Sequence, residues 1–377
     1  MSVWHWLALF GLVLVLIPWV LYPIAMASLG RRVGDQADSH TESPRAATIT
    51  VVIATRAPPD AVRLRLENLV QGNWPAERLE LVVAVDGDPA PYKFLGLHPP
   101  PRRLMVVARA GNPGKAAALN AGVAAATSEL VVFTDTAQQF APDTLARLVE
   151  AMANPWFGAV SGALELGNET AAHSPIATYW RMERRLRGAE ARVHSAIGVS
   201  GSVYIMRRAL WSPLPAGLIL DDLWIPMRLI LAGHRVGFAE AAVARDFRTT
   251  TTGQEFRRKV RTLTGNLQLV AWLPSVLAPW RNPVWVQFLC HKLLRLLTPQ
   301  ALLLLGVGMI GSAFTFSPAV GWWLVGAGIG GTILGSLLPG GIGRRIRGGL
   351  AWGLSMQGAI LMATWNGVRG RWDVWQA

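Results

Sequence analysis

The distribution of apolar residues divides the chain into a more polar middle and two apolar ends. Residues 3–29 contain no Lys, Arg, Asp or Glu, and about 20 apolar residues are enough to cross a bilayer. Arg31 and Arg32 follow directly, and basic residues tend to stay on the cytoplasmic side. We therefore expect a transmembrane helix over residues 1–30 and a polar linker over residues 31–46, with the next domain in the cytoplasm.

Short apolar runs alternate with amphipathic segments through the middle of the chain. Buried strands are expected at Thr48–Thr55, Leu79–Val85, Leu104–Ala108, Leu130–Thr134 and Phe157–Glu165. Helices are expected between them, because apolar residues there recur at helical spacing. This alternation predicts an α/β fold with a mostly parallel, doubly wound sheet over residues 47–281.

The C-terminal part of the chain is again apolar. Residues 282–298 are expected to form an amphipathic helix with basic residues on one side, as helices at a membrane interface do. Those basic residues are His291, Lys292 and Arg295. About three membrane helices are expected within residues 299–377. Glycines spaced by four, such as Gly326 and Gly330, predict close packing among them.

The composition fits a membrane protein that binds phosphate. Of its 377 residues 51% are hydrophobic and only 16% are charged, unlike an ordinary soluble enzyme. The net charge of +13 fits nucleic acid, anionic lipid or a nucleotide. We find no nucleic-acid-binding motif, and several arginines flank apolar segments, so membrane and phosphate are favoured. The single cysteine, Cys290, excludes an internal disulfide and a cysteine-based metal site.

Acidic residues directly follow two of the expected strands. Asp86 follows the second strand, and Asp135 follows the fourth. The carboxyl ends of parallel strands form the edge at which open α/β sheets bind their ligands. Asp135 is therefore a candidate to hold a divalent cation against a phosphate. Asp86 is a candidate to accept hydrogen bonds from a nucleobase, and its alternative is an ordinary Asp-Gly turn.

Two helix starts carry further candidates. Lys115 precedes a small-residue helix with Asn120, and it is either a contact of a diphosphate or a solvated lysine. Asp221 and Asp222 stand together before another helix, and adjacent carboxylates repel. Asp222 is therefore a candidate general base whose pKa Asp221 helps to raise. The alternative is a helix cap followed by an acid in the first turn.

A basic helix precedes the C-terminal apolar part. It begins with Gln254, Arg257 and Arg258. Arginines at that place would neutralise a leaving diphosphate. The alternative is a basic surface on anionic lipid headgroups next to the membrane.

Five short motifs occur in the order found in one enzyme family. They are Asp86 in VDGD, Asp135 in FTDTA, Gly201 in SGSVYIMRR, the pair Asp221-Asp222, and Gln254-x-x-Arg257-Arg258. With membrane segments on both sides, the chain resembles the membrane-integrated family 2 glycosyltransferases. That group includes the cellulose, hyaluronan and poly-N-acetylglucosamine synthases and ceramide glucosyltransferase. The resemblance covers about residues 48–280.

The resemblance implies a GT-A fold that binds a nucleoside-diphosphate sugar, by family analogy a UDP-sugar. Asp86 would contact the base, and Asp135 would hold Mg²⁺ or Mn²⁺ on the diphosphate. Asp222, with Asp221 beside it, would deprotonate the acceptor hydroxyl and so invert the anomeric centre. The other substrate-binding residues would be Thr55, Lys115, Asn120, Gly201, Gln254, Arg257 and Arg258, the last three in a QxxRW motif.

Two positions depart from the family pattern. Ala137 replaces the second aspartate of the DxD motif, which removes one contact to the cation. Arg258 replaces the tryptophan of QxxRW, which removes an aromatic platform for an acceptor sugar and argues against processive synthesis.

The resemblance also implies a place for the protein. We expect a multi-pass enzyme of the bacterial inner membrane with a cytoplasmic catalytic domain and a lipid or saccharide acceptor. The alternative, suggested by Ala137 and Arg258, is an inactive, membrane-anchored nucleotide-binding subunit of a polysaccharide assembly complex. Polysaccharide export or assembly proteins are the expected partners, and no nucleic acid is expected.

Overall fold

The computed structural model divides into two units. It describes residues 2–34, 47–94, 96–167, 175–248 and 251–374. The sheet unit comprises Met26–Thr249 and Leu269–Trp285, and the helical unit comprises Met1–Ala25, Thr250–Gln268 and Val286–Ala377. Most of the linker expected at residues 31–46 lies outside the described residues.

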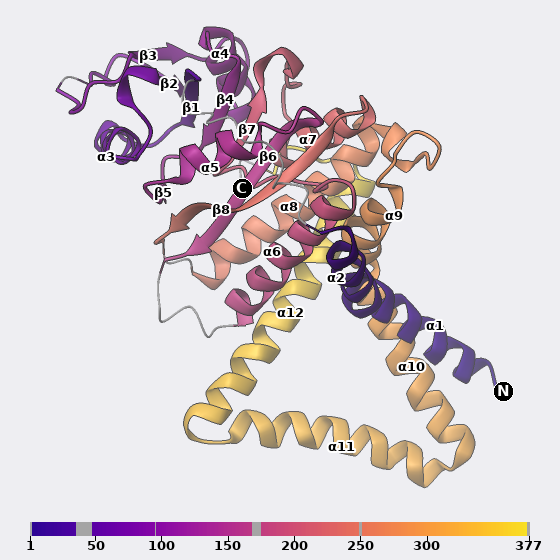
Figure 1. Ribbon diagram of the computed structural model, residues 1–377. Coiled ribbons are helices and arrows are strands. Elements are labelled where there is room, and N and C mark those ends of the chain that lie inside the picture. Colours follow the sequence, from indigo (N-terminus) through magenta and orange to yellow (C-terminus); the bar gives the residue numbers. More distant parts are fainter. Residues whose placement is uncertain (1, 35–46, 95, 168–174, 249–250, 375–377) are drawn as a thin grey trace. The chain divides into compact units, whose positions relative to one another are not determined.

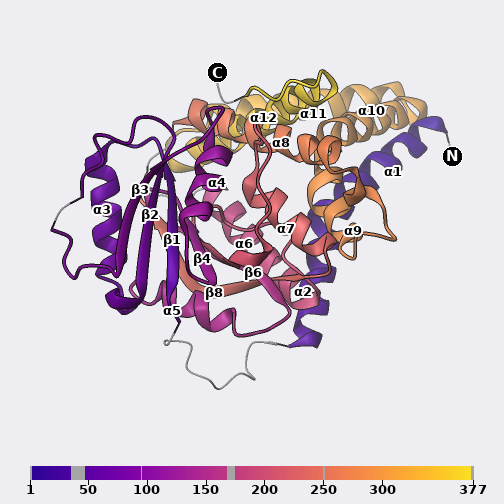
Figure 2. The same cartoon turned by 90° about the horizontal axis from the view of Figure 1, so that it is seen from above.

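The sheet unit is built on eight strands in the order β3-β2-β1-β4-β7-β6-β8-β5. The strands are β1 Ile49–Thr55, β2 Leu79–Val85, β3 Arg103–Ala108, β4 Leu130–Thr134, β5 Gln138–Phe140, β6 Phe157–Leu166, β7 Tyr204–Arg207 and β8 Arg235–Asp246. β3, β2, β1 and β4 are parallel and lie side by side in Figure 2. β7 is antiparallel to both of its neighbours. The predicted α/β fold is confirmed, whereas the pattern misses the three-residue β5, because so short a strand carries no periodicity.

Helices cover both faces of the sheet. They are α3 Pro59–Val70, α4 Lys115–Ala125, α5 Thr144–Ala151, α6 Pro175–Val193 and α7 Asp221–Leu231. Val51 of β1 belongs to one core with Leu66 of α3 and Leu148 of α5. Its neighbour Val52 points to the other face, where a Cβ added to Gly122 of α4 would lie 2.5 Å from Val52 Cγ1. The strand is apolar on both faces because both faces are buried, as expected for a doubly wound sheet.

The helical unit consists of helices, several of them long and apolar. They are α1 Val3–Leu16, the first part of α2 Tyr22–Val33, most of α8 Thr252–Trp272, α9 Trp285–Phe288, α10 Thr298–Phe316, α11 Pro318–Leu337 and α12 Gly340–Val368. α1 lies alongside α10 (Figure 1), and the two backbones approach closely, since a Cβ on Gly308 would lie 2.3 Å from Ala8 N. Close packing predicted at Gly326 and Gly330 is wrong: a Cβ there meets no described atom within 4 Å. Small residues permit close packing at the α1–α10 contact instead.

Three helical segments of the described chain are long and apolar enough to cross a membrane. They are Val3–Val33, Trp285–Phe316 and Pro318–Leu337. The further span expected near residues 349–365 falls within α12, which is not among them.

The chain runs from Trp285 to Phe316 as one helical path, instead of an interfacial helix followed by a separate span. Two of the basic residues expected on an exposed side of residues 282–298 are buried against the N-terminal helix. The Arg295 guanidinium lies 4.5 Å from the centroid of the Trp19 ring. The rings of His291 and Tyr22 lie 6.4 Å apart. These contacts turn the basic side of the helix toward another helix of the same unit.

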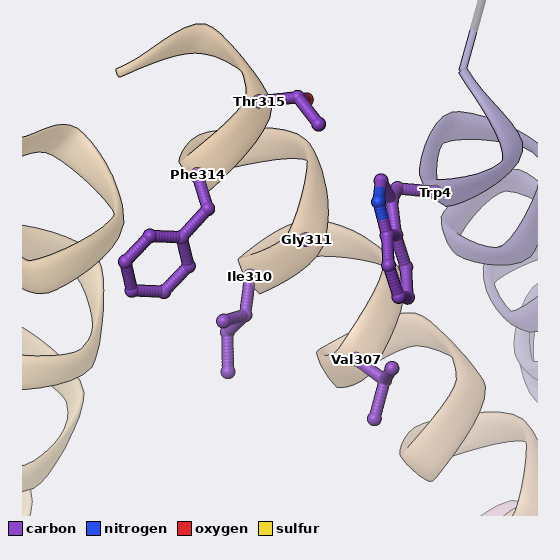
Figure 3. A pocket seen from close by; sticks show the side chains of 6 residues that line it. All are labelled: Trp4, Val307, Ile310, Gly311, Phe314 and Thr315. Atoms are coloured by element: carbon purple, nitrogen blue, oxygen red, sulfur yellow. The ribbon is translucent and has the colours of Figure 1, made fainter. Parts of the chain in front are cut away.

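An apolar pocket of about 450 Å³ lies between α1 and α10. Figure 3 shows the Trp4 ring beside α10 at Gly311, whereas the Ile310 and Phe314 side chains project from the opposite side of α10. The residues around it are Trp4, Val307, Ile310, Gly311, Phe314 and Thr315. None of these six side chains is ionisable, so this pocket offers contact surface and no acid–base chemistry.

Candidate active site

Charged residues mark the carboxyl edge of the sheet. Each of the four parallel strands is followed directly by one: Arg56 after β1, Asp86 after β2, Arg109 after β3 and Asp135 after β4. The strands are parallel neighbours, so these residues share the edge at which such sheets bind ligands. Only the two acids were predicted as site residues, although the same signal, a charged residue directly after a buried strand, also marks the two arginines.

Asp86 is held by donors on both of its oxygens. Arg56 Nε lies 2.6 Å from Oδ2, and Arg109 Nε lies 2.6 Å from Oδ1. The backbone N–H of Gly114 also donates to Oδ1 at 3.1 Å. The Asp86 side chain is only 5% exposed. A nucleobase at this place would therefore meet an aspartate already combined with two arginines, which offers acceptor and donor atoms together.

Lys115, the first residue of α4, lies among the other acids of this edge. Its Nζ is 3.2 Å from Asp135 Oδ1 and 3.4 Å from Asp221 Oδ2. Gly201 leaves room beside it: a Cβ there would lie 3.5 Å from Lys115 Nζ and 3.6 Å from Asp222 Cβ. The structure thus brings five predicted site residues into one group, which we call the acid–lysine cluster: Lys115, Asp135, Gly201, Asp221 and Asp222.

The cluster has a strongly negative electrostatic environment. Burial alone would lower the pKa of the Lys115 ammonium, but the carboxylates of Asp135, Asp221 and Asp222 outweigh burial and raise that pKa. Burial and the same three carboxylates also raise the pKa of the buried Tyr204 hydroxyl well above its ordinary value. The three carboxylates favour a bound cation over a bound anion, unless the anion brings a cation with it.

Asp221 and Asp222 lie in the first turn of α7. The N-cap position of this helix is Leu220, so neither aspartate caps it. Asp221 is 8% exposed, whereas Asp222 is partly exposed. The backbone oxygen of Asp222 accepts a hydrogen bond from Val199 N–H at 2.9 Å, which ties the start of α7 to the loop before Gly201. Of the two acids, Asp222 is the one open to a substrate hydroxyl.

Two other predicted substrate-binding residues make supporting hydrogen bonds. Asn120 Nδ2 donates to Leu214 O at 2.9 Å, and Leu214 N–H donates to Asn120 Oδ1 at 2.8 Å. Thr55 Oγ1 accepts from the Ala57 N–H and from the Thr136 hydroxyl. Asn120 fixes α4 against the loop before α7, and Thr55 fixes the loops that follow β1 and β4.

Gln254, Arg257 and Arg258 lie in the part of α8 that belongs to the helical unit, whereas the acid–lysine cluster belongs to the sheet unit. Gln254 and Thr251 cap the helix reciprocally, because Thr251 N–H donates to Gln254 Oε1 and Gln254 N–H donates to Thr251 Oγ1. Arg258 Nε lies 3.7 Å from a Glu255 carboxylate oxygen, and Arg257 is exposed.

The residues around Asp135 fit a metal ion only if another group completes its coordination. No three His, Cys, Asp or Glu side chains of the described residues are placed together to hold a metal ion. Ala137 is exposed and offers no side-chain oxygen. Mg²⁺, however, is commonly held by one or two carboxylates together with substrate phosphates. Asp135, whose side chain is 37% exposed, fits the role of such a single carboxylate ligand.

A buried arginine that the sequence analysis missed lies behind Asp135. Arg65 of α3 is 2% exposed, and its Nη2 donates to Thr134 Oγ1 at 2.8 Å. Burial lowers the pKa of Arg65 to about 9, and the Asp135 carboxylate opposes that shift. The sequence does hold a clue to this residue, because Arg65 stands on the apolar side of α3 next to the core residue Leu66. Arg65 holds in place the strand end that presents Asp135.

Comparison with known proteins finds a family match within the sheet unit. Residues 50–212 match the model of glycosyl transferase family 2. No curated protein matches the chain. A solved mannosyltransferase, PcManGT from Pyrobaculum calidifontis in complex with GDP-Man and Mn²⁺, is 20% identical with a TM-score of 0.67, over 96% of this chain and 99% of that one. This likeness shows a shared GT-A fold.

Glucosyl-3-phosphoglycerate synthase from Mycobacterium tuberculosis, in complex with Mn²⁺, UDP and glucosyl-3-phosphoglycerate, is 18% identical. Its TM-score is 0.41, over 61% of this chain and 81% of that one.

Proposed function

We propose that the protein is an inverting, divalent-cation-dependent glycosyltransferase. It moves a sugar from a nucleoside diphosphate, UDP by family resemblance, to a lipid or saccharide acceptor. The observation that carries this proposal is the acid–lysine cluster at the carboxyl edge of a family 2 domain. Direct displacement at a sugar needs a base for the acceptor and positive charge for the leaving diphosphate, and this cluster supplies both.

Asp222 is the proposed general base. Its carboxylate takes the proton of the acceptor hydroxyl, whose oxygen attacks the anomeric carbon on the side opposite to the leaving diphosphate. The carbon–oxygen bond to the diphosphate breaks as the new one forms, so the configuration inverts. Asp221 is bound to Lys115 at 3.4 Å, and its role is to keep a second negative charge beside the base.

The positive charge comes from two sources. Mg²⁺ or Mn²⁺ bound by Asp135 and the diphosphate would neutralise charge on the leaving group. Lys115 adds an ammonium group next to the same carboxylate. The proposal assigns the base of the nucleotide to Asp86 with its two arginines, and it assigns to Gln254, Arg257 and Arg258 the covering of acceptor and diphosphate.

We propose a bacterial inner membrane location with the sheet unit in the cytoplasm. Support comes from the three apolar helical segments and from Arg31 and Arg32, which follow the first of them. The acceptor is then a membrane lipid or a growing saccharide, and polysaccharide export or assembly proteins are the partners. Arg258 in place of an aromatic residue favours a single transfer over processive synthesis, which the length of the product on a gel would test.

The test is release of nucleoside diphosphate by the purified full chain in lipid nanodiscs. A panel of UDP- and GDP-sugars is offered with Mg²⁺, with Mn²⁺ or with a chelator. We expect release from one donor, lost in the chelator and in Asp222→Asn. The exposed Asp60→Asn in α3 is the matched control and should keep full activity. Full activity of Asp222→Asn would refute the assignment of the base.

The second candidate is an inactive nucleotide-binding subunit, and Ala137 and Arg258 favour it. It predicts tight binding of a nucleotide without release of diphosphate from any donor, whether or not membrane lipids and saccharide acceptors are added. The same panel, read once for binding and once for turnover, separates the two candidates.

A further inference from the structure

The only carboxylate assigned to the metal ion is already engaged on both of its oxygens. Asp135 Oδ1 lies 3.2 Å from Lys115 Nζ, and Asp135 Oδ2 accepts the Ser202 hydroxyl at 3.2 Å. Ala137 provides no replacement oxygen two residues on. A divalent cation that approaches Asp135 therefore meets an ammonium group in contact with the same carboxylate.

We propose that Lys115 is the resident cation of this site, and that it keeps a divalent cation out until a nucleoside diphosphate arrives. Metal and diphosphate then enter together: the cation takes Asp135 Oδ1, and the ammonium turns to the diphosphate oxygens. The inference rests on the proposed function, since it concerns the order in which donor and cation occupy that site.

Charge explains why the two ligands enter together. Without a nucleotide, a divalent cation on Asp135 would stand next to the Lys115 ammonium, and two positive charges at that distance repel. Alternatively the ammonium would have to give up Asp135 and keep only Asp221, 3.4 Å from its Nζ, although only 25% of the lysine side chain is exposed. A diphosphate removes both costs, because its oxygens accept the ammonium and bind the cation as well.

The residues around the exchange differ in their freedom to move. Lys115 has a flexible four-carbon stem and a single point charge, and Gly201 leaves space beside its Nζ. Asp135, in contrast, follows a strand end that the buried Arg65 fixes through Thr134. We therefore expect the Lys115 side chain to move, while the Asp135 carboxylate stays in place for the ammonium or for the metal ion.

The experiment compares Mn²⁺ and nucleotide binding in the full chain in nanodiscs, with no sugar donor present. Electron paramagnetic resonance counts Mn²⁺ bound to the nucleotide-free protein, and calorimetry measures UDP and GDP binding with and without Mn²⁺. For the wild type we expect weak Mn²⁺ binding alone, and nucleotide affinity raised by Mn²⁺ about 5- to 150-fold, the usual range of coupling between two ligands.

Variants then assign the effect to one side chain. Lys115→Met should tighten Mn²⁺ binding to the nucleotide-free protein by about tenfold or more, because three carboxylates lose their shared ammonium. Lys115→Arg, which keeps the charge, should bind Mn²⁺ as weakly as the wild type. The exposed Lys93→Met removes the same charge from the same unit and should change neither measurement.

Each outcome decides the question. Wild-type protein that binds Mn²⁺ without nucleotide as tightly as Lys115→Met overturns the proposal, and so does nucleotide binding that ignores Mn²⁺. The wild-type calorimetry needs no variant, so the proposal stays testable if Lys115→Met does not fold. If neither UDP nor GDP binds with any cation, the proposed function fails. If they bind and sugar is transferred while Mn²⁺ already binds tightly alone, only this inference fails.

Discussion

Acids at the amino ends and at the carboxyl ends of the parallel strands have different kinds of partners. At the amino edge, Glu80 is the second residue of β2 and its side chain is 6% exposed. It accepts hydroxyl hydrogen bonds from Thr50 at 2.9 Å, Thr127 at 2.8 Å and Ser128 at 3.3 Å. Burial alone would raise the pKa of Glu80, and these hydrogen bonds outweigh it and lower that pKa. Glu80 thus has its donors within its own domain.

At the carboxyl edge, Asp135, Asp221 and Asp222 share a single lysine, Lys115. Within the cluster three carboxylates surround one ammonium, so a bound cation would relieve the repulsion among them. The difference teaches how to separate structural from functional acids in this fold. Glu80, which hydroxyl donors and Arg102 surround, stabilises the sheet, whereas acids that share one flexible lysine retain capacity for a ligand.

The largest effect that would test this comparison is expected from Asp222→Asn. Loss of the base should lower kcat/KM by about 10²- to 10⁴-fold. The melting temperature should stay within a few degrees of the wild type, because the Asp222 contact that ties α7 to its neighbouring loop is made by its backbone oxygen. Initial rates and thermal unfolding of the same preparation measure both. A large loss of stability with little loss of rate would place Asp222 among the structural acids.

Glu80→Gln should show the opposite behaviour. The amide keeps the shape but cannot accept from all three hydroxyls, and an unsatisfied buried donor costs about 1–3 kcal/mol. We expect a lower melting temperature with kcat/KM unchanged at a temperature where the variant is folded. If Glu80→Gln loses activity while it keeps its stability, the division of the sheet into a structural and a functional edge is wrong.

Two glycines of the sheet unit provide a smaller and more local test. Gly201→Ala places a methyl group at ordinary contact distance between Lys115 and Asp222, so it should fold normally. We expect it to lower kcat/KM by about tenfold, because it takes space beside the proposed base. Gly122→Ala should instead lower stability by about 1–3 kcal/mol, since its Cβ would lie 2.5 Å from Val52 Cγ1. Measurements of rate and of unfolding should show a loss of rate alone for Gly201→Ala and a loss of stability for Gly122→Ala.

The location of residues that directly follow the parallel strands was predictable, because the carboxyl ends of parallel strands meet at one edge of the sheet. Asp86 and Asp135 could be placed from the sequence once the parallel order was inferred, and the structure finds β2, β1 and β4 adjacent. The side chains that contact these acids could not be predicted in the same way. That Lys115 would contact Asp135 and Asp221 depends on the approach of α4 and α7, which are separated by about a hundred residues and carry no pairing signal in one sequence.

Arg65 and Gln254 illustrate the other two reasons for failure. Arg65 stands on the apolar side of a helix, and hydrophobic patterning treats a charge there as an interruption instead of a partner for a strand end. Gln254 belongs to a family-like motif, yet its side chain caps its own helix through Thr251, because a Thr and a Gln three residues apart satisfy the first turn locally. A residue that matches a functional motif can therefore be used for a local hydrogen bond, and the motif alone does not tell the two uses apart.

The smallest expected effect is the pH dependence of the stability that Glu80 contributes at the amino edge. Since the pKa of Glu80 is lower in the folded protein, the unfolded chain takes up the proton first as the pH falls. The stability due to Glu80 is thus complete above the pKa of an unfolded glutamate, about 4.3, and is lost as the pH falls through the folded value. Melting temperatures from pH 7 downward should fall less steeply in Glu80→Gln than in the wild type, so that the two curves converge in acid. Curves for Glu80→Gln that stay parallel to the wild type would remove Glu80 from the structural edge.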